Sequence, residues 1–177
     1  ELSLSAVLDR IVRAACELGG ARYGARGGLD AQGTQLAERR TDGLTPEQQE
    51  AIGDLPRGHG ILGLLIDDPR PLRLERISDH PKSYGFPAHH PPMRTFLGVP
   101  VRTRDRAFGN LYLTEKQGGG RFTQADEDVV VALAAAAGVA VENARLYEQA
   151  DQRRRWLEAA REITEMLLGT VDRTQAL

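Results

Sequence analysis

Residues 95–116 read TFLGVPVRTRDRAFGNLYLTEK, and this stretch decides the fold class. Two runs rich in β-branched and aromatic residues, Thr95 to Arg104 and Ala107 to Lys116, flank a short polar turn at residues 105–106. Runs of this kind around a tight turn predict a β-hairpin. We therefore expect two neighbouring strands of an antiparallel sheet here.

The chain before the hairpin adds helices and strands. Apolar residues from Leu4 to Leu18 recur at spacings of four and three, which indicates one face of a helix. Thr45 and Gln48 form a capping box at the start of a second, short helix. In chain order we expect a helix at 4–18, strands at 21–28 and 34–40, helices at 45–55 and 61–67, and a strand at 72–74. An antiparallel sheet flanked by terminal helices is an α+β architecture.

The chain after the hairpin predicts one long C-terminal helix. Thr123 is expected to cap it, with Asp126 near the positive end of the helix dipole. The run Val129–Val141 is almost wholly apolar, so we expect it to be buried on most sides. Beyond it, a heptad spacing runs through Leu146, Gln149, Arg153, Trp156, Ala160, Ile163 and Leu167. This pattern indicates either a solvated linker helix or a parallel dimeric signalling helix. We divide the chain into a domain at 1–148 and a linker or signalling helix at 149–177 that leads to a further domain.

Composition excludes several classes of function. The 177 residues are 41% apolar, which suffices for a core, and the net charge of −2 gives no reason to expect nucleic acid or an anionic membrane as partner. The longest apolar run has 13 residues, too few to span a bilayer, and no signal peptide is visible. We therefore expect a cytoplasmic fragment of a longer protein. The single cysteine, Cys16, excludes an intramolecular disulfide and covalent haem attachment through CxxCH.

The loop at residues 75–94 holds three of the four histidines and carries the segment His89-His90-Pro91-Pro92-Met93. Adjacent histidines on an extended chain point to opposite sides, so only one of them can enter a pocket. The prolines stiffen the backbone and can present one imidazole at a defined angle. Imidazole is a common metal ligand and an axial ligand of haem, whereas the alternative is an ordinary exposed loop histidine.

Tyr112 is a second candidate because of its strand face. Alternation places it with Asn110 and Thr114, and places Leu111 and Leu113 on the other face. If the leucine face meets the helices, Tyr112 faces solvent; if the opposite face lines a cavity, its hydroxyl is a hydrogen-bond donor inside it. Spacing alone does not choose between these. The sequence has no P-loop, GxSxG elbow, HExxH helix or CxxC pair, so we do not expect this chain to be an enzyme.

Several runs resemble the first GAF domain of the dormancy-sensor histidine kinases DosS (also called DevS) and DosT. The resemblance covers about residues 2–150, and the similar runs are 21–25, 63–66, 85–101, 108–116 and 133–138. It implies a GAF-type antiparallel sheet and non-covalently bound haem b. His90 is then the proximal iron ligand and Tyr112 the distal residue. The cofactor-binding residues that the resemblance implies are His90, Tyr112, Gly27, Gly28, Asp30, Met93 and Phe96, with His90 as the metal ligand.

The resemblance also implies a mechanism and partners. Ferrous haem held by one histidine binds O2, NO or CO on its other side, and a Tyr112 hydroxyl discriminates O2 from CO by hydrogen bonding. Glycine at 27 or 28 would leave a wider gas path, which favours gas sensing over redox sensing. The expected partners are a second copy joined through the helices, a downstream kinase domain and a response regulator. The alternatives are a cofactor-free GAF dimerisation module and a GAF domain that binds another small molecule.

Overall fold

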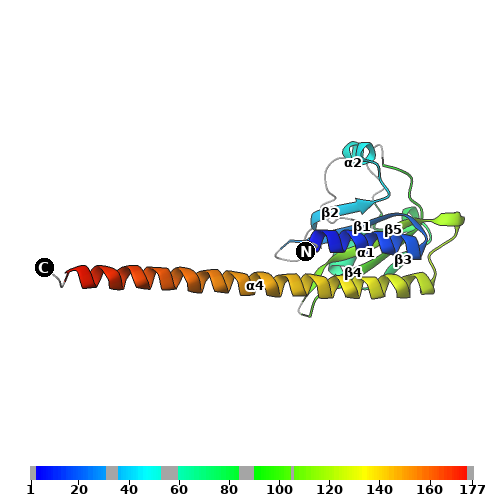
Figure 1. Cartoon of the computed structure of the whole chain (residues 1–177). Helices are drawn as coiled ribbons and strands as arrows, with labels where there is room; N and C mark the ends of the chain where they lie inside the picture. The colour runs from blue at the N-terminus through cyan, green and yellow to red at the C-terminus, as the bar shows by residue number, and fades with distance from the viewer. Residues whose placement is uncertain (1–2, 31–35, 53–59, 84–89, 105, 175–177) are drawn as a thin grey trace. The chain divides into compact units, whose positions relative to one another are not determined.

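A computed structural model describes residues 3–30, 36–52, 60–83, 90–104 and 106–174 of the chain (Figure 1). These residues belong to two compact units, Glu1–Val141 and Glu142–Leu177. The first unit holds the whole sheet and the start of the long helix. The second unit is the remainder of that helix. The boundary between a sensory domain and a signalling helix, predicted after residue 148, remains a prediction.

The first unit is built on a five-stranded sheet with the strand order β2-β1-β5-β4-β3, in which all neighbours are antiparallel. The hairpin predicted from residues 95–116 is confirmed as β4 and β5, and the α+β class is confirmed with it. The strands are β1 (Ala21–Leu29), β2 (Leu36–Asp42), β3 (Leu72–Leu74), β4 (Phe96–Arg102) and β5 (Ala107–Lys116). The helices are α1 (Leu4–Gly19), α2 (Pro46–Ile52), α3 (Ile61–Asp67) and α4 (Gln124–Thr174), with 3-10 turns at Ile77–Asp79 and Gln117–Gly119.

The helix starts follow the capping signals in the sequence. Thr45 and Gln48 bond reciprocally, because each backbone N–H donates to the other side chain, at 2.9 and 3.2 Å. Thr123 and Asp126 do the same at the start of α4, at 2.8 and 3.2 Å. Parts of the predicted 34–40 strand and 45–55 helix, the turn residue Asp105, and His89 lie outside the described residues.

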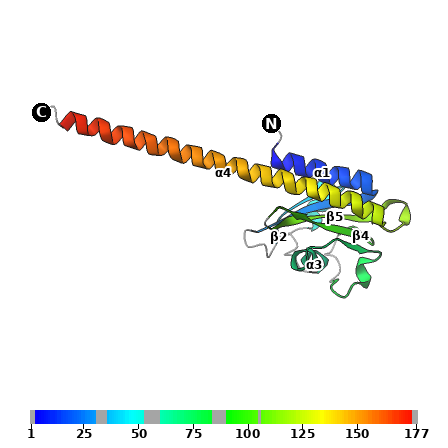
Figure 2. The same cartoon turned by 90° about the horizontal axis from the view of Figure 1, so that it is seen from below.

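One face of the sheet packs against α1 and the first part of α4 (Figure 2). Leu97, Leu111 and Leu113 are at most 1% exposed on this face. They meet a cluster of helix residues that consists of Leu8, Val12, Ala15, Cys16, Val130, Ala134, Ala137 and Val141. This helix face holds the main core of the unit.

The expectation that Val129–Val141 is buried on most sides is wrong. Val131 and Val139 are 41% and 61% exposed, whereas Val130 and Ala134 are at most 2% exposed. The sheet and α1 cover only one side of α4 over residues 129–141. The apolar side chains on the other side of this stretch are therefore exposed to solvent. By length and composition α4 could also cross a membrane, with a mean hydropathy of 1.6 over 18 residues, although a core helix meets the same criteria.

The described residues of the second unit are all helical and belong to α4. Three apolar positions of the predicted heptad seam, Leu146, Trp156 and Ile163, are 54%, 69% and 55% exposed. Large apolar side chains at seam positions are normally covered by a partner helix in coiled coils. The seam therefore remains a surface on which a second helix could pack.

Candidate functional site

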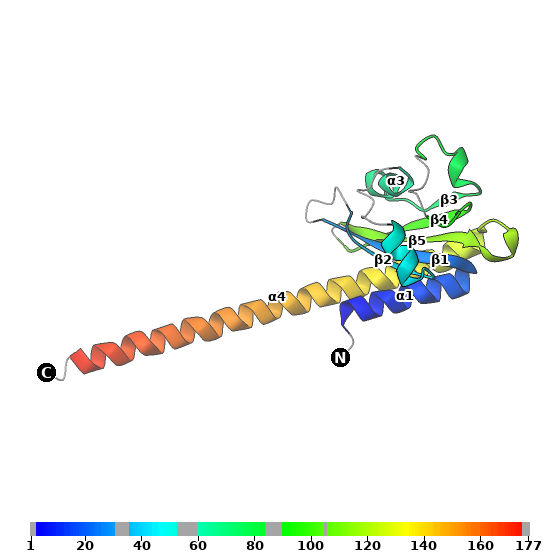
Figure 3. The same ribbon diagram turned by 90° about the horizontal axis from the view of Figure 1, so that it is seen from above.

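The sheet face opposite α1 and α4 lies next to α3 (Figure 3). On this face Ile61, Leu65, Ile77 and Phe96 are buried, and six half-buried side chains pack against them: Leu62, Leu64, Leu72, Leu74, Met93 and Tyr112. We call these ten residues the α3-side cluster. The leucines of β5 meet the helices, but the expectation that Tyr112 then faces solvent is wrong, because Tyr112 packs in this separate apolar cluster.

Tyr112 sits in this cluster with a protonated hydroxyl. Its ring stacks on Phe96 with the ring centres 5.9 Å apart and the planes at 23°. Burial raises the pKa of the Tyr112 phenol, while the nearby Arg39 guanidinium acts in the opposite direction. A raised pKa keeps the hydroxyl protonated at neutral pH, so it can donate a hydrogen bond.

His90 is half-buried at the start of the described segment that leads into β4. Its Nδ1 lies 2.9 Å from the carbonyl oxygen of Pro91, a distance that fits a hydrogen bond donated by Nδ1–H. In that tautomer the lone pair is on Nε2. Such a second contact commonly orients an imidazole that ligates a metal through its other nitrogen.

Met93 joins the histidine segment to the strand of Tyr112. Its side chain is half-buried in the α3-side cluster, and the Thr114 hydroxyl donates to its Sδ atom at 3.0 Å. Thr114 lies on the same strand face as Tyr112. The segment that carries His90 is therefore anchored next to the strand that carries the phenol.

Asn110 is the residue that sequence reasoning did not single out. It is 1% exposed, and within the described parts of the chain neither atom of its carboxamide has a hydrogen-bond partner. A Cβ atom added at Gly27 would lie 2.7 Å from Asn110 Oδ1 and 2.5 Å from Leu36 Cδ2. The only signal in the sequence was the shared strand face with Tyr112.

The structure does not bring all the predicted residues to this face. Gly27 lies in register with Asn110, but the space above it is filled by Leu36 and Asn110, so the wide gas path expected at Gly27 is not seen there. Gly28 lies on the other face, where an added Cβ would meet the Glu38 side chain at 3.6 Å. Asp30 is half-buried just after β1.

A chain of polar contacts leads from the histidine segment to α1 and α4. The backbone N–H of Arg94 donates to the Glu115 carboxylate at 2.8 Å, and Glu115 has a left-handed backbone with φ of +59°. The next residue, Lys116, donates through Nζ to the Gly19 carbonyl and to the Asp126 carboxylate, both at 2.9 Å. The end of β5 thus contacts the end of α1 and the first turn of α4.

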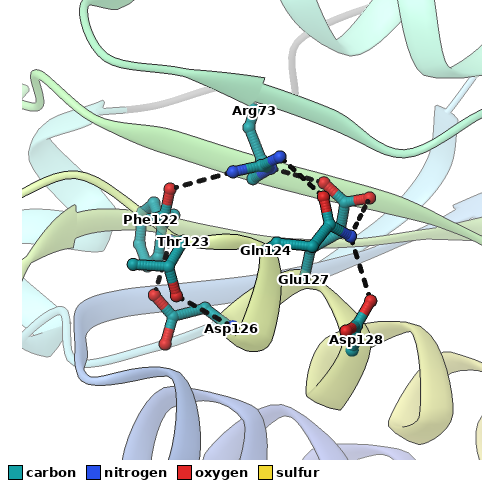
Figure 4. Close-up of polar contacts among 7 residues, drawn as sticks. All are labelled: Arg73, Phe122, Thr123, Gln124, Asp126, Glu127 and Asp128. Atoms are coloured by element: carbon teal, nitrogen blue, oxygen red, sulfur yellow. Dashed lines mark hydrogen bonds and ion pairs between the residues drawn. The ribbon is translucent and has the colours of Figure 1, made fainter.

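A second connection starts from β3, whose two leucines belong to the α3-side cluster. Arg73 points to the other side of β3 and contacts the start of α4 (Figure 4). Its guanidinium donates to Glu127 at 2.5 Å, to Gln124 at 2.8 Å and to the Phe122 carbonyl at 3.3 Å. Both edges of the candidate site are therefore linked to the first turn of α4.

The donor set fits haem better than a metal ion held by protein ligands alone. Among the described residues there is no group of three or more His, Cys, Asp or Glu side chains that could hold a metal. Haem iron needs only one protein ligand, and apolar and aromatic side chains suit a porphyrin. The α3-side cluster supplies such side chains next to the segment of His90, and the unpartnered Asn110 carboxamide offers a polar group on the same face.

Comparison with known proteins identifies the fold. Residues 1–142 match the sequence model of a protein family described as GAF domain. The GAF domain of a phosphoenolpyruvate-protein phosphotransferase from Acinetobacter is 24% identical, with a TM-score of 0.67, over 84% of this chain and 88% of that one.

Two further solved structures share the architecture at lower identity. A free methionine-R-sulfoxide reductase from Neisseria meningitidis, in complex with its substrate, is 19% identical with a TM-score of 0.65, over 83% of each chain. A domain assigned to a two-component sensor histidine kinase of Sinorhizobium meliloti is 17% identical with a TM-score of 0.60, over 86% of this chain and 99% of that one. Identities this low show a shared fold and carry no assignment of ligand.

Proposed function

From the premise that the chain belongs to the GAF domain family, small-molecule sensory domains that occur in histidine kinases, we propose that it is a haem-b sensor of O2, NO or CO. One observation carries the proposal. A protonated phenol, Tyr112, and the segment that follows His90 meet in the α3-side cluster, apart from the main core. This combination of an imidazole, a hydrogen-bond donor and apolar walls is what a haem pocket needs.

His90 would hold the iron through Nε2, with Nδ1–H fixed by the Pro91 carbonyl. When bound, the haem iron would supply the position at which a diatomic gas binds. Phe96 and Met93 would contact the porphyrin as members of the α3-side cluster. Asp30 would lie near its edge. Gly27, covered by Leu36 and Asn110, and Gly28, on the other face, would take no direct part.

The Tyr112 hydroxyl would discriminate between gases. The hydroxyl would donate a hydrogen bond to the gas, and O2 would accept that bond better than CO. A donor in a low-dielectric site strengthens that preference. The same donor would favour a stable oxygen complex, and thus gas sensing over redox sensing.

The signal would leave the pocket through two routes. One runs from Arg94 through Glu115 and Lys116 to Asp126, and the other from β3 through Arg73. Both end at the first turn of α4, so a bound gas with different affinity for two states of these contacts would shift that helix. Exposed seam residues of α4 would join two copies of the chain into a parallel dimer.

The chain would therefore act as a non-catalytic sensory part of a cytoplasmic histidine kinase. Its kinase domain and response regulator would receive the signal from α4. A GAF module that only dimerises, without cofactor, is the competing function favoured by the exposed seam alone.

The test is an absorption spectrum of the 177-residue chain produced with added haem. We expect a Soret band that shifts with dithionite, O2 and CO. His90→Ala should abolish five-coordinate ferrous haem, because it removes the axial nitrogen, while His89→Ala and His80→Ala should retain it. A missing Soret band in the unmodified chain would sink the haem proposal and favour the dimerisation module. Normal ferrous haem in His90→Ala would overturn the ligand assignment.

The role of Tyr112 has its own test. Tyr112→Phe removes the hydroxyl and keeps the ring that stacks on Phe96. We expect faster O2 dissociation or autoxidation with CO binding nearly unchanged. Equal effects on both gases would contradict the discrimination.

A further inference from the structure

The buried Asn110 carboxamide lowers the stability of the protein when no ligand is bound. It is 1% exposed, and within the described ranges both Nδ2 and Oδ1 lack hydrogen-bond partners. Buried polar groups are nearly always paired, since an unpaired one loses its hydrogen bonds to water and gains nothing in return. An exception of this kind in a folded protein points to a partner that binds later.

Two apolar residues, Gly27 and Leu36, lie beside the Asn110 carboxamide. Its amide oxygen lies above Gly27, which has no side chain, and next to the aliphatic end of Leu36. A leucine at 110 would therefore meet apolar neighbours there.

The position of Asn110 relates it to the candidate pocket. It lies two residues before Tyr112 on the same face of β5, at a spacing of about 6.5–7 Å along a strand. Arg39, whose guanidinium acts on the Tyr112 phenol, is in register with Gly27, which is itself in register with Asn110. The phenol, the guanidinium and the carboxamide thus belong to the same face of the sheet.

We propose that Asn110 is a second specificity-determining residue of the ligand site, whose carboxamide donates a hydrogen bond to the diatomic ligand or to a water bound beside it. The inference rests on the proposed haem function and deepens it. Two donors, Tyr112 and Asn110, make the pocket select O2 over CO more strongly than the phenol alone. The unpartnered amide is the state of the residue before ligand arrives.

The experiment replaces Asn110 by leucine in the 177-residue chain. Asn143→Leu is the matched control, because Asn143 is the other asparagine and is exposed on α4. We expect the haem-free Asn110→Leu protein to unfold at the same or a higher urea concentration, since an unpaired buried amide is removed. With haem bound, its Kd for O2 should rise roughly fivefold, the worth of one hydrogen bond, and its Kd for CO by less than about twofold.

The outcomes separate this inference from the function on which it rests. If the unmodified chain shows no Soret band, the haem function fails and the role of Asn110 fails with it. If the unmodified chain binds haem but Asn110→Leu leaves O2 affinity unchanged, only the role of Asn110 is overturned. A haem-free Asn110→Leu protein that unfolds at lower urea with unchanged gas affinity marks a structural residue. Should the leucine variant not fold, Asn110→Ser tests the same role. Its shorter hydroxyl side chain should weaken O2 binding and leave the affinity for CO unchanged.

Discussion

The two faces of the sheet are built from the same strands and differ in chemistry. On the helix face, Leu97, Leu111 and Leu113 are at most 1% exposed and pack on aliphatic helix residues. On the α3-side face, Phe96 and Tyr112 stack in a cluster that is largely half-buried. The helix face is the more deeply buried one, whereas the other face is less buried and carries the stacked aromatic pair.

Buried polar groups show the same contrast. Arg26, on the helix face, is 7% exposed and donates to Asp9 and Ser5, each at 3.0 Å. Asn110, on the other face, is more deeply buried and has no partner among the described residues. A satisfied polar group stabilises the fold, and an unsatisfied one costs stability that a ligand can return. In the proposed function, one face maintains the structure and the other binds the ligand.

The largest expected effect is a cavity in the helix face. Leu113→Ala removes a side chain that is 0% exposed, so we expect the free energy of unfolding to fall by about 3–4 kcal/mol in urea titrations. Leu65→Ala, in the α3-side cluster, should cost about 2 kcal/mol, because half-buried neighbours can close over the gap. Leu18→Ala is the control, since Leu18 is 65% exposed. Equal losses at 113 and 65 would contradict the difference in packing between the faces.

A second comparison uses two glycines. An added Cβ at Gly138 would lie 2.0 Å from the Arg102 carbonyl oxygen, which cannot move without shifting β4. At Gly98 it would meet side-chain atoms of Leu65 and Phe96 at 2.6–2.8 Å, which can rotate. We expect Gly138→Ala to cost about 3 kcal/mol and Gly98→Ala about 1 kcal/mol, measured by urea unfolding. A larger loss at 98 would show that the α3-side face is the more rigid one.

Acid should weaken the link between β5 and α4. Partial burial acts to raise the pKa of Asp126, but hydrogen bonds from Thr123 and Lys116 outweigh it and hold the pKa below its ordinary value of 3.8. A depressed folded-state pKa gives stability that is present above pH 4 and is lost as the pH falls below it. The free energy of unfolding of Asp126→Asn should therefore fall less steeply than that of the unmodified chain as the pH is lowered through 4. Glu148→Gln, an exposed change on the same helix, should keep the full dependence.

The smallest effect on folding is expected in the seam of α4. Trp156 is 69% exposed, so Trp156→Ala should change the free energy of unfolding of the first unit by less than about 0.5 kcal/mol. It should nevertheless weaken self-association in sedimentation velocity, because a seam position loses its large side chain. Glu148→Gln again serves as the control. A monomer at all concentrations in the unmodified chain would remove the proposed dimer.

The elements of the fold could be predicted because their signals are local. The hairpin at residues 95–116 and the caps at Thr45 and Thr123 depend on residues a few positions apart, and the structure confirms them. Burial of α4 depends on how much of its circumference other elements cover, so an apolar run alone predicted it wrongly.

The candidate site could be predicted only in part. Alternation shows that Tyr112 opposes Leu111 on β5, but which face meets the helices depends on where α1 and α4 pack. Asn110 could be placed beside Tyr112 for the same reason. That its amide lacks a partner depends on Gly27 and Leu36, which approach it only in the folded chain.

The left-handed backbone at Glu115 has a consequence for how a small movement spreads. A non-glycine residue in this conformation stores about 1–2 kcal/mol, held here by the contact with Arg94. Loss of that contact would leave the strain of Glu115 without this support, and relaxation of its backbone would change the direction of the chain at Lys116. The two contacts of Lys116, with Gly19 and Asp126, would be strained by the same movement. Backbone strain at one residue thus connects the segment of His90 to the ends of two helices.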